Sequence, residues 1–146
     1  MIRRYHISDT RHLIDLLDQN TPDFFAPLEK AAYVSYLQNK IDDYFVYEIN
    51  DTIVGCGGIN YEIENKTARI SWDIIHPEYQ RKGIGKKLVD HRIQHIKNKK
   101  YIDIIIVRTS QMAFPFYKKL GFKLESVKED FWAKGFDLYL MSKKNR

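Results

Sequence analysis

The sequence feature that most constrains the fold is a junction between a predicted strand and a predicted helix at residues 74–85. A run rich in isoleucine leads into His76-Pro77, and two glycines, Gly83 and Gly85, then open a stretch with helical periodicity. Glycines in the first turn of a helix let the backbone approach a ligand closely, and the free N–H groups and the helix dipole there favour a phosphate. The junction is therefore a candidate anion-binding loop.

Basic side chains are concentrated at this junction. The chain has 24 Lys and Arg against 19 Asp and Glu, a net charge of +5, which fits nucleic acid, an anionic surface or a phosphorylated small molecule as a partner. The loop lacks the Gly-Lys-Ser/Thr ending of nucleoside triphosphate loops and the three-glycine dinucleotide fingerprint, so those nucleotides are poor candidates. In the alternative interpretation, the glycines only shape a tight turn and the lysines form a solvated helix face. The basic residues are Arg81, Lys82, Lys86, Lys87, Arg92, Lys97, Lys99 and Lys100.

The pattern along the rest of the chain predicts one α+β domain over residues 1–146, with a mixed, mostly antiparallel sheet of about seven strands flanked by about four helices. The run at 101–107 is almost unbroken in its apolar character, as expected for a central strand covered on both faces. Strands are predicted at residues 2–7, 44–49, 52–63, 68–75, 101–107, 122–131 and 136–142, and helices from Ser8-Asp9 to Asn20 and at 28–39, 83–98 and 111–120.

The bulk properties are those of a protein without a membrane span, a disulfide or a metal. The 146 residues are 44% hydrophobic, enough for one real core, and no stretch approaches the roughly 18 apolar residues of a membrane helix. The first residues lack the apolar run of a signal peptide, so a cytoplasmic location is expected. Cys56 is the single cysteine and cannot pair within the chain, and His91 and His95 lack the additional ligands of a zinc site.

Two motifs carry a resemblance to a known family. Residues Gln80-Arg81-Lys82-Gly83-Ile84-Gly85 fit every fixed position of Gln/Arg-x-x-Gly-x-Gly/Ala, the donor loop of the GNAT superfamily of acyl-CoA-dependent N-acyltransferases. A second family segment, which ends in Phe-Tyr-x-x-x-Gly-Phe, is similar to Ala113–Phe122. The order of predicted elements also resembles that family over nearly the whole chain. The resemblance implies that the central parallel strands 68–75 and 101–107 splay apart, with the pantetheine arm of the donor between them.

The same resemblance implies acetyl-CoA as the acetyl donor and assigns the residues that bind it. Backbone groups of the strand would pair with pantetheine and the acetyl carbonyl and stabilise the oxyanion that forms during the reaction. The loop would hold the pyrophosphate. Ser110 stands where the family often places Asn; its hydroxyl can cap a helix but reaches less far. The expected donor-binding set is Asp73, Ile74, Ile75, Gln80, Arg81, Lys82, Gly83, Ile84, Gly85, Lys86 and Ser110.

Tyr117 occupies the position where the family usually carries the general acid that protonates the departing CoA thiolate. A phenol with a pKa of about 10 is protonated at neutral pH and able to donate; the alternative is a core aromatic on a short helix. Candidates for the general base are Asp73 and then Glu62, either of which could instead be a solvated strand residue. Strand alternation places Trp72 and Asp73 on opposite faces, so only one of them is expected to face the acceptor.

Aromatic residues are the candidates for the acceptor-binding site, because aromatic walls suit an amine with an apolar or cationic body. They are Phe24, Phe25, Tyr33 and Trp132, with Phe131 beside the last of these, and packing beneath a long loop is the alternative for each. The predicted function is transfer of acetyl from acetyl-CoA to a primary amine of a small molecule or peptide, by direct attack through a tetrahedral intermediate.

Two other functions stay open. The domain could bind acyl-CoA as a sensor or scaffold without turnover, or it could bind nucleic acid through its basic helix. Single-strand binders interleave aromatic and basic residues, and the segment 83–100 has no such pattern, so neither a nucleic acid nor a membrane is expected as a partner. Dimers are common among proteins that resemble this chain, and the strand with Phe136, Leu138 and Leu140 could supply a homodimer interface.

Overall fold

In the computed structural model, which describes residues 1–146 throughout, a seven-stranded mixed sheet is flanked by four α-helices. The spatial order of the strands is β1-β2-β3-β4-β5-β7-β6, and every neighbouring pair is antiparallel except β4 and β5. The predicted α+β class is confirmed. The strands are β1 (Ile2–Arg4), β2 (Asp43–Ile49), β3 (Thr52–Glu62), β4 (Thr67–Ile75), β5 (Ile104–Thr109), β6 (Lys123–Ala133) and β7 (Phe136–Lys144), and the helices are α1 (Thr10–Gln19), α2 (Glu29–Asn39), α3 (Ile84–Lys97) and α4 (Phe114–Lys119).

Local sequence explains the meander β2-β3-β4. Asn50 and Asp51 both adopt positive φ, 49° and 62°, which is the geometry of a two-residue hairpin turn that matches the strand twist. The next connection is a short 3₁₀ turn over Ile63–Asn65, followed by Lys66 in the left-handed region with φ of 52°. Both turns fall where the sequence predicts them, and β3 ends one residue earlier than predicted.

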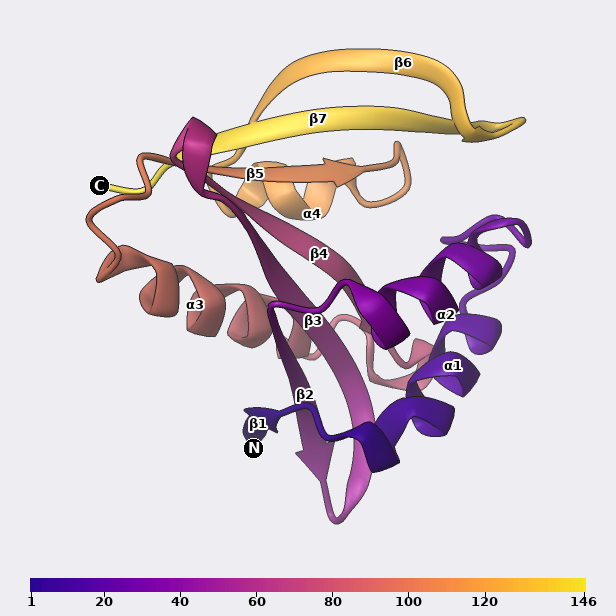
Figure 1. The fold of residues 1–146 in the computed structure, drawn as a ribbon. Helices are drawn as coiled ribbons and strands as arrows, with labels where there is room; N and C mark the ends of the chain where they lie inside the picture. The colour runs from indigo at the N-terminus through magenta and orange to yellow at the C-terminus, as the bar shows by residue number, and fades with distance from the viewer.

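Helices cover the meander on both faces, and each face has its own apolar core. The larger core joins side chains of the sheet such as Ile70 to α3 and α4, and the smaller joins others such as Val46 to α1 and α2. Figure 1 shows α3 on one side of β2–β4 and the α1–α2 pair on the other. No helix in the structure is long and apolar enough to cross a membrane.

The parallel strands β4 and β5 are paired over only the first part of their length and then diverge. Their pairing runs from Thr67 opposite Ile104 to Ile70 opposite Val107 and then stops. Beyond this point β4 is paired only with β3, and β5 only with β7. Figure 1 shows the two strands diverging, so the splayed geometry that the resemblance implies is confirmed.

Three details of the C-terminal half differ from the sequence prediction. The strand β5 begins at Ile104 instead of residue 101, and Ile104 is 41% exposed, so β5 is not covered on both faces. The reason is that α1 packs on β3 and β4, and the core beneath α1 and α2 contains no residue of β5. Helix α4 is shorter than predicted, because turns occupy the residues before Phe114.

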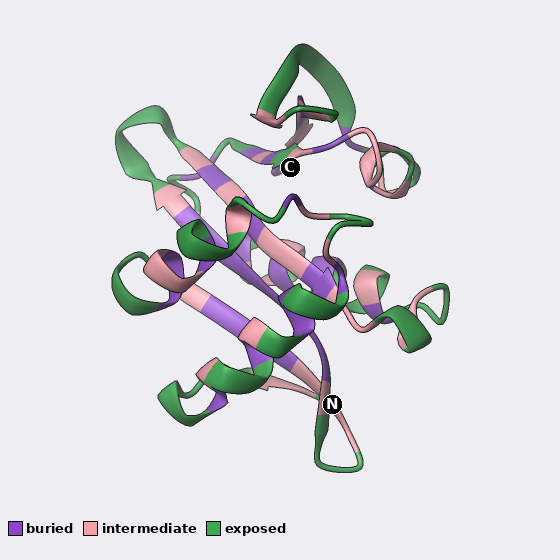
Figure 2. Ribbon diagram, turned by 90° about the vertical axis from the view of Figure 1, so that its right-hand side faces the viewer, coloured by how far each residue is buried: buried purple, intermediate pink, exposed green.

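In Figure 2 the arch at the top is β6, which is exposed along 123–130.

Candidate active site

A cleft of about 940 Å³ opens where β4 and β5 separate, large enough for a cofactor-sized ligand. Its walls come from the free half of β4, the end of β5, the start of α3, α4 and the α1–α2 connector. Most of the residues that the sequence nominates line this cleft. They are Phe24, Phe25, Asp73, Ile74, Ile75, Gln80, Arg81, Gly83, Gly85, Lys86, Ser110, Tyr117 and Trp132.

The start of α3 is built as the sequence predicts. Gly83 has φ of 83° and precedes the helix, and a left-handed conformation of this kind strains any residue with a side chain. The first bonded amide of the helix is that of Lys87, which donates to the Gly83 carbonyl at 3.0 Å, so the amides before it are free to donate to a ligand. A Cβ on Gly85 would lie 3.1 Å from Cζ of Phe116, which explains the second glycine.

Three residues of the loop 80–85 make contacts outside the cleft: Gln80, Lys82 and Ile84. Gln80 connects the loop to the end of β4 and to the residue after α1. Its side-chain amide donates to the Ile75 carbonyl at 3.3 Å and to Asn20 Oδ1 at 3.1 Å. Lys82 points to the ring of Tyr79, with Nζ 5.3 Å from the centroid, and Ile84 is buried in the larger core. The side chains of Lys82 and Ile84 therefore lie outside the cleft, and only their backbone remains available to a ligand there.

A β-bulge interrupts β4 beside the cleft. Trp72 has φ of 50°, and the pairing with β3 leaves Trp72 and Asp73 together opposite the single residue Gly57. The Trp72 ring packs on Tyr33, with ring centroids 4.8 Å apart, on the α1–α2 side. The Asp73 side chain points to the opposite side of the sheet, toward α3 and α4.

The expectation that Trp72 and Asp73 point to opposite faces agrees with the structure, and which of them faces the acceptor stays a prediction. Both residues also line the cleft. The reason is that the strands part at this point, so the cleft passes between them and opens on both faces. One face then offers the free helix N-terminus, and the other offers aromatic side chains.

Asp73 is the centre of a buried polar cluster. The hydroxyl of Tyr117 donates to its Oδ2 at 2.5 Å, and Nη1 of Arg92 lies 2.5 Å from its Oδ1. Burial, followed by the charge of Asp73 and the hydrogen bond to it, raises the pKa of Tyr117 well above its ordinary value of 10. The Tyr117 phenol therefore stays protonated at every physiological pH.

Arg92 is the largest departure from the surface role that its sequence context suggests. It is fully buried on α3, where its Nε donates to the Leu88 carbonyl and its Nη1 to the Gly58 carbonyl, each at 3.0 Å. Burial alone would lower the pKa of Arg92, but the Asp73 carboxylate more than offsets it, and the pKa is raised. Gly57 provides the space, since a Cβ there would lie 2.6 Å from Cζ of Arg92.

The side of the cleft away from the α3 N-terminus, where the sequence predicts the acceptor, is lined by Phe24, Phe25, Tyr36 and Trp132. Glu29 joins them. Its carboxylate accepts a hydrogen bond from the Ala26 amide at 2.8 Å, and burial raises its pKa above the ordinary 4.5. Sequence analysis did not single out Glu29 or Tyr36. The two residues are seven positions apart on α2, so they lie on the same face of the helix. This spacing could have indicated from the sequence that they share a site.

Two other nominated residues lie outside the cleft. Tyr33 is buried behind Trp72, with its hydroxyl 2.8 Å from that of Tyr44, so it supports the wall without forming it. Glu62 is exposed at the end of β3, opposite Thr67, where β4 begins. That position is far along the strand from the bulge, because β4 runs a further five residues before it reaches Trp72.

Comparison with known proteins agrees with this geometry. The family model of the acetyltransferase (GNAT) domain matches residues 13–145. An N-alpha-acetyltransferase of Sulfurisphaera tokodaii is 26% identical over 158 residues, with 97% of this chain and 90% of that protein covered. The match to the cysteine-rich protein 2-binding protein of Mus musculus, at 34% identity, covers 59% of this chain but 11% of that protein. The match to an uncharacterized N-acetyltransferase of Methanocaldococcus jannaschii, at 27% identity, covers 65% of this chain and 46% of that protein. The chain therefore spans less than half the length of these two relatives.

Solved structures share the whole fold at low sequence identity. The ribosomal-protein-S18-alanine N-acetyltransferase of Escherichia coli superposes with a TM-score of 0.82 at 16% identity, with 99% of this chain and 92% of that one covered. An aminoglycoside 6′-N-acetyltransferase in complex with coenzyme A gives 0.79 at 17% identity, with 100% and 97% covered. At these identities the likeness is one of fold, and the acceptors of those two proteins differ from each other.

Proposed function

This chain belongs to the GNAT family of acetyltransferases, and from that premise we propose that it transfers the acetyl group of acetyl-CoA to a primary amine. The observation that carries the proposal is the separation of β4 from β5 beside the free N-terminus of α3. One end of the cleft then suits a phosphate, and the strand edge suits an extended amide-containing arm. The two features lie in one continuous cleft.

The donor would bind along the α3 side of this cleft. Free amides from Gly83 to Lys86, with the nearby side chains of Arg81 and Lys86, would hold the pyrophosphate. Backbone groups of Asp73, Ile74 and Ile75, which have no strand partner on the β5 side, would pair with pantetheine and the acetyl carbonyl. The same donors would stabilise the oxyanion of the tetrahedral intermediate. Ser110, buried before α4, would contribute a hydroxyl.

The proton balance of the reaction assigns roles to Tyr117 and Asp73. In direct attack the amine nitrogen loses one proton and the departing sulfur gains one. Tyr117 would donate its hydroxyl proton to the thiolate, and Asp73, already bonded to that hydroxyl, would take the proton from the attacking nitrogen and return it to the phenol oxygen. Of the two carboxylates proposed as base, Asp73 alone borders the cleft.

The test is release of free thiol from acetyl-CoA across a panel of amines and peptides, with wild type and Tyr117→Phe in parallel. We expect turnover on one acceptor class and a fall of at least about tenfold in the variant, equivalent to roughly 1.4 kcal/mol of transition-state stabilisation. Unchanged turnover would remove Tyr117 as the acid. Acetyl-CoA binding without turnover on any amine would favour a sensor, and no acetyl-CoA binding would refute the proposal.

A further inference from the structure

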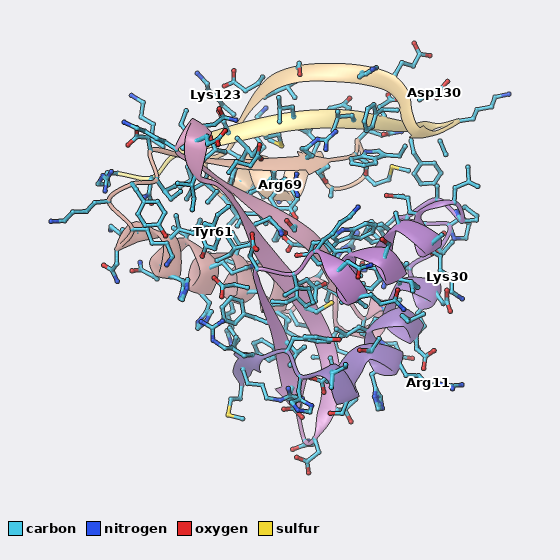
Figure 3. The ribbon with its side chains drawn as sticks, in the orientation of Figure 1. Arg11, Lys30, Tyr61, Arg69, Lys123 and Asp130 are labelled. Carbon is cyan, nitrogen blue, oxygen red and sulfur yellow. The ribbon has the colours of Figure 1, made fainter.

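We propose that the acceptor is a primary amine that also carries an anionic group, a carboxylate or a phosphate, and that Arg69 and Arg108 bind this group. The inference rests on the proposed acetyl transfer and concerns the acceptor side of the same cleft. Both arginines line the cleft, one from each of the strands that separate. Figure 3 labels Arg69 at the place where β4 and β5 begin to diverge.

The two arginines lie on the same face of the sheet. On β4, Ile70 belongs to the core under α3, so the neighbouring Arg69 points to the opposite face. On β5, Val107 belongs to that core as well, and Arg108 points to the same face as Arg69. Because Ile70 is paired with Val107, the two arginines flank the last rung of the parallel ladder. They form a pair of cations on the face that carries Trp72, Phe25 and Tyr36.

Neither guanidinium has a carboxylate partner. Seven other arginines or lysines of the chain form an ion pair with an acid, among them Arg3 with Asp9 and Arg92 with Asp73. Arg69 and Arg108 form no ion pair and donate no side-chain hydrogen bond to the protein. Arg108 instead stacks near Phe131 and Trp132, with Cζ 5.3 and 5.5 Å from the ring centroids. Stacking orients the guanidinium and leaves its N–H groups free for a bidentate anion.

The charge balance on this side of the cleft is positive. Asp73 is already paired with the buried Arg92 and faces the other side of the sheet. Glu29 is then the single carboxylate at this end of the cleft, against Arg69, Arg108 and Lys40. An acceptor with several positive charges would add repulsion to this arrangement, whereas an acceptor with a negative charge would relieve it.

The donor does not require these two arginines. Its phosphates have the free amides at the start of α3 together with Arg81 and Lys86, which lie at the other end of the cleft. Arg69 stands four residues before Asp73 on β4, and Arg108 follows Val107, the last β5 residue paired with β4. At about 3.3 Å per residue, Arg69 lies about 13 Å along β4 from Asp73. The anion should therefore be separated from the reacting amine by several bonds.

The experiment compares matched acceptors that differ in one charge. Thiol release is measured on pairs of amines with a terminal carboxylate or its carboxamide, on a phosphate-bearing amine, and on short peptides with acidic or amidated residues at positions two and three. The small molecules and the peptides are separate arms, so the source of the anion is identified. The variants are Arg69→Gln, Arg108→Gln and both together. Arg11→Gln, an exposed change on α1 outside the cleft, is the matched control.

We expect wild type to prefer the anionic member of a pair by at least about tenfold in kcat/KM, which corresponds to about 1.4 kcal/mol. The double variant should lose this preference, while its KM for acetyl-CoA stays at the wild-type value and the control keeps the preference. A preference for neutral or polycationic amines, or a preference that survives in the double variant, would overturn the inference and leave the acetyl transfer intact. If the KM for acetyl-CoA rises instead, the two arginines serve the donor.

A second readout keeps the inference separate from the proposed chemistry. Trp72 and Trp132 border the acceptor side, so acceptor binding to the CoA-saturated protein is followed by tryptophan fluorescence without turnover. Tighter binding of the carboxylate than of the carboxamide, abolished in the double variant, supports the inference even where no thiol is released. Equal binding of both by the CoA-saturated protein refutes it.

Discussion

Replacement of Arg92 by methionine would remove the buried countercharge of Asp73 while it keeps most of the side-chain volume. Arg92 has no exposed surface, and the Asp73 side chain is 14% exposed at the cleft. The variant leaves an ionised carboxylate that water reaches from one side only. The carbonyls of Gly58 and Leu88 would also lose the donors that Arg92 supplies.

The expected cost follows from this geometry. Removal of one partner of a buried ion pair costs about 3–5 kcal/mol, because the other charge is left uncompensated. The partial exposure of Asp73 places the variant at the lower end, at about 3 kcal/mol. Asp73→Asn keeps an oxygen acceptor for Tyr117 and Arg92 but leaves the fully buried Arg92 guanidinium without its countercharge, so we expect a cost of about 3–5 kcal/mol. In the double variant Asp73→Asn, Arg92→Met no charge is stranded, and its cost should be less than the sum of the two by about 1–3 kcal/mol.

Urea unfolding of the wild type, the two single variants and the double variant measures these differences in the free energy of unfolding. Arg11→Met is an exposed control that should change this free energy by less than about 0.5 kcal/mol. A cost below about 1 kcal/mol for Arg92→Met would refute the reasoning, since the buried pair would then contribute no more than a surface pair. Additive effects of the two substitutions would refute it as well, because they would show that Asp73 and Arg92 are not coupled.

Two further predictions concern other parts of the fold. Gly57→Ala should destabilise the protein by about 1–3 kcal/mol in urea unfolding, because the new Cβ would lie 2.6 Å from Cζ of Arg92; a neutral effect would contradict the packing of the pair against β3. The buried Asp9 has its pKa lowered below the ordinary 3.8, chiefly by the hydrogen bond from Arg3, so its contribution to stability is full above that value and is lost as the pH falls through the lower folded-state pKa. Asp9→Asn should therefore cost about 2 kcal/mol at pH 7 and progressively less below pH 4 in parallel unfolding measurements, and a pH-independent difference would contradict the ion pair.

Features that depend on a few consecutive residues were predictable from the sequence. The loop from Gln80 to Gly85 is one, because free amides and a left-handed glycine are local properties of a helix start. The separation of β4 and β5 also came from the sequence, through the resemblance that the two motifs carry.

Features that arise from distant contacts were not predictable. Arg92 stands in a basic segment and looks like part of a solvated face, yet it follows Leu88 and precedes Ile96 at intervals of four, within the buried stripe of α3. Its partner is on β4, and the two meet only when the helix packs on the sheet. Arg69 and Arg108 are likewise brought together by strand register, which single-sequence reasoning did not supply.

The β-bulge decides which face of the sheet the side chains of Trp72 and Asp73 occupy, a point that strand alternation alone left open. In a regular strand, every second residue after Ile70 would point to α3, so Trp72 would point there and Asp73 would share a face with Arg69. The extra residue in β4 reverses both. Asp73 thereby reaches Tyr117 and Arg92, and Trp72 joins the aromatic wall on the side of Phe25. Without the bulge, Asp73 would lie on the face that carries Arg69 and Arg108 and would neutralise them. The same backbone irregularity therefore places Asp73 beside Tyr117 and keeps it away from the two arginines, where we propose that the anion of the acceptor binds.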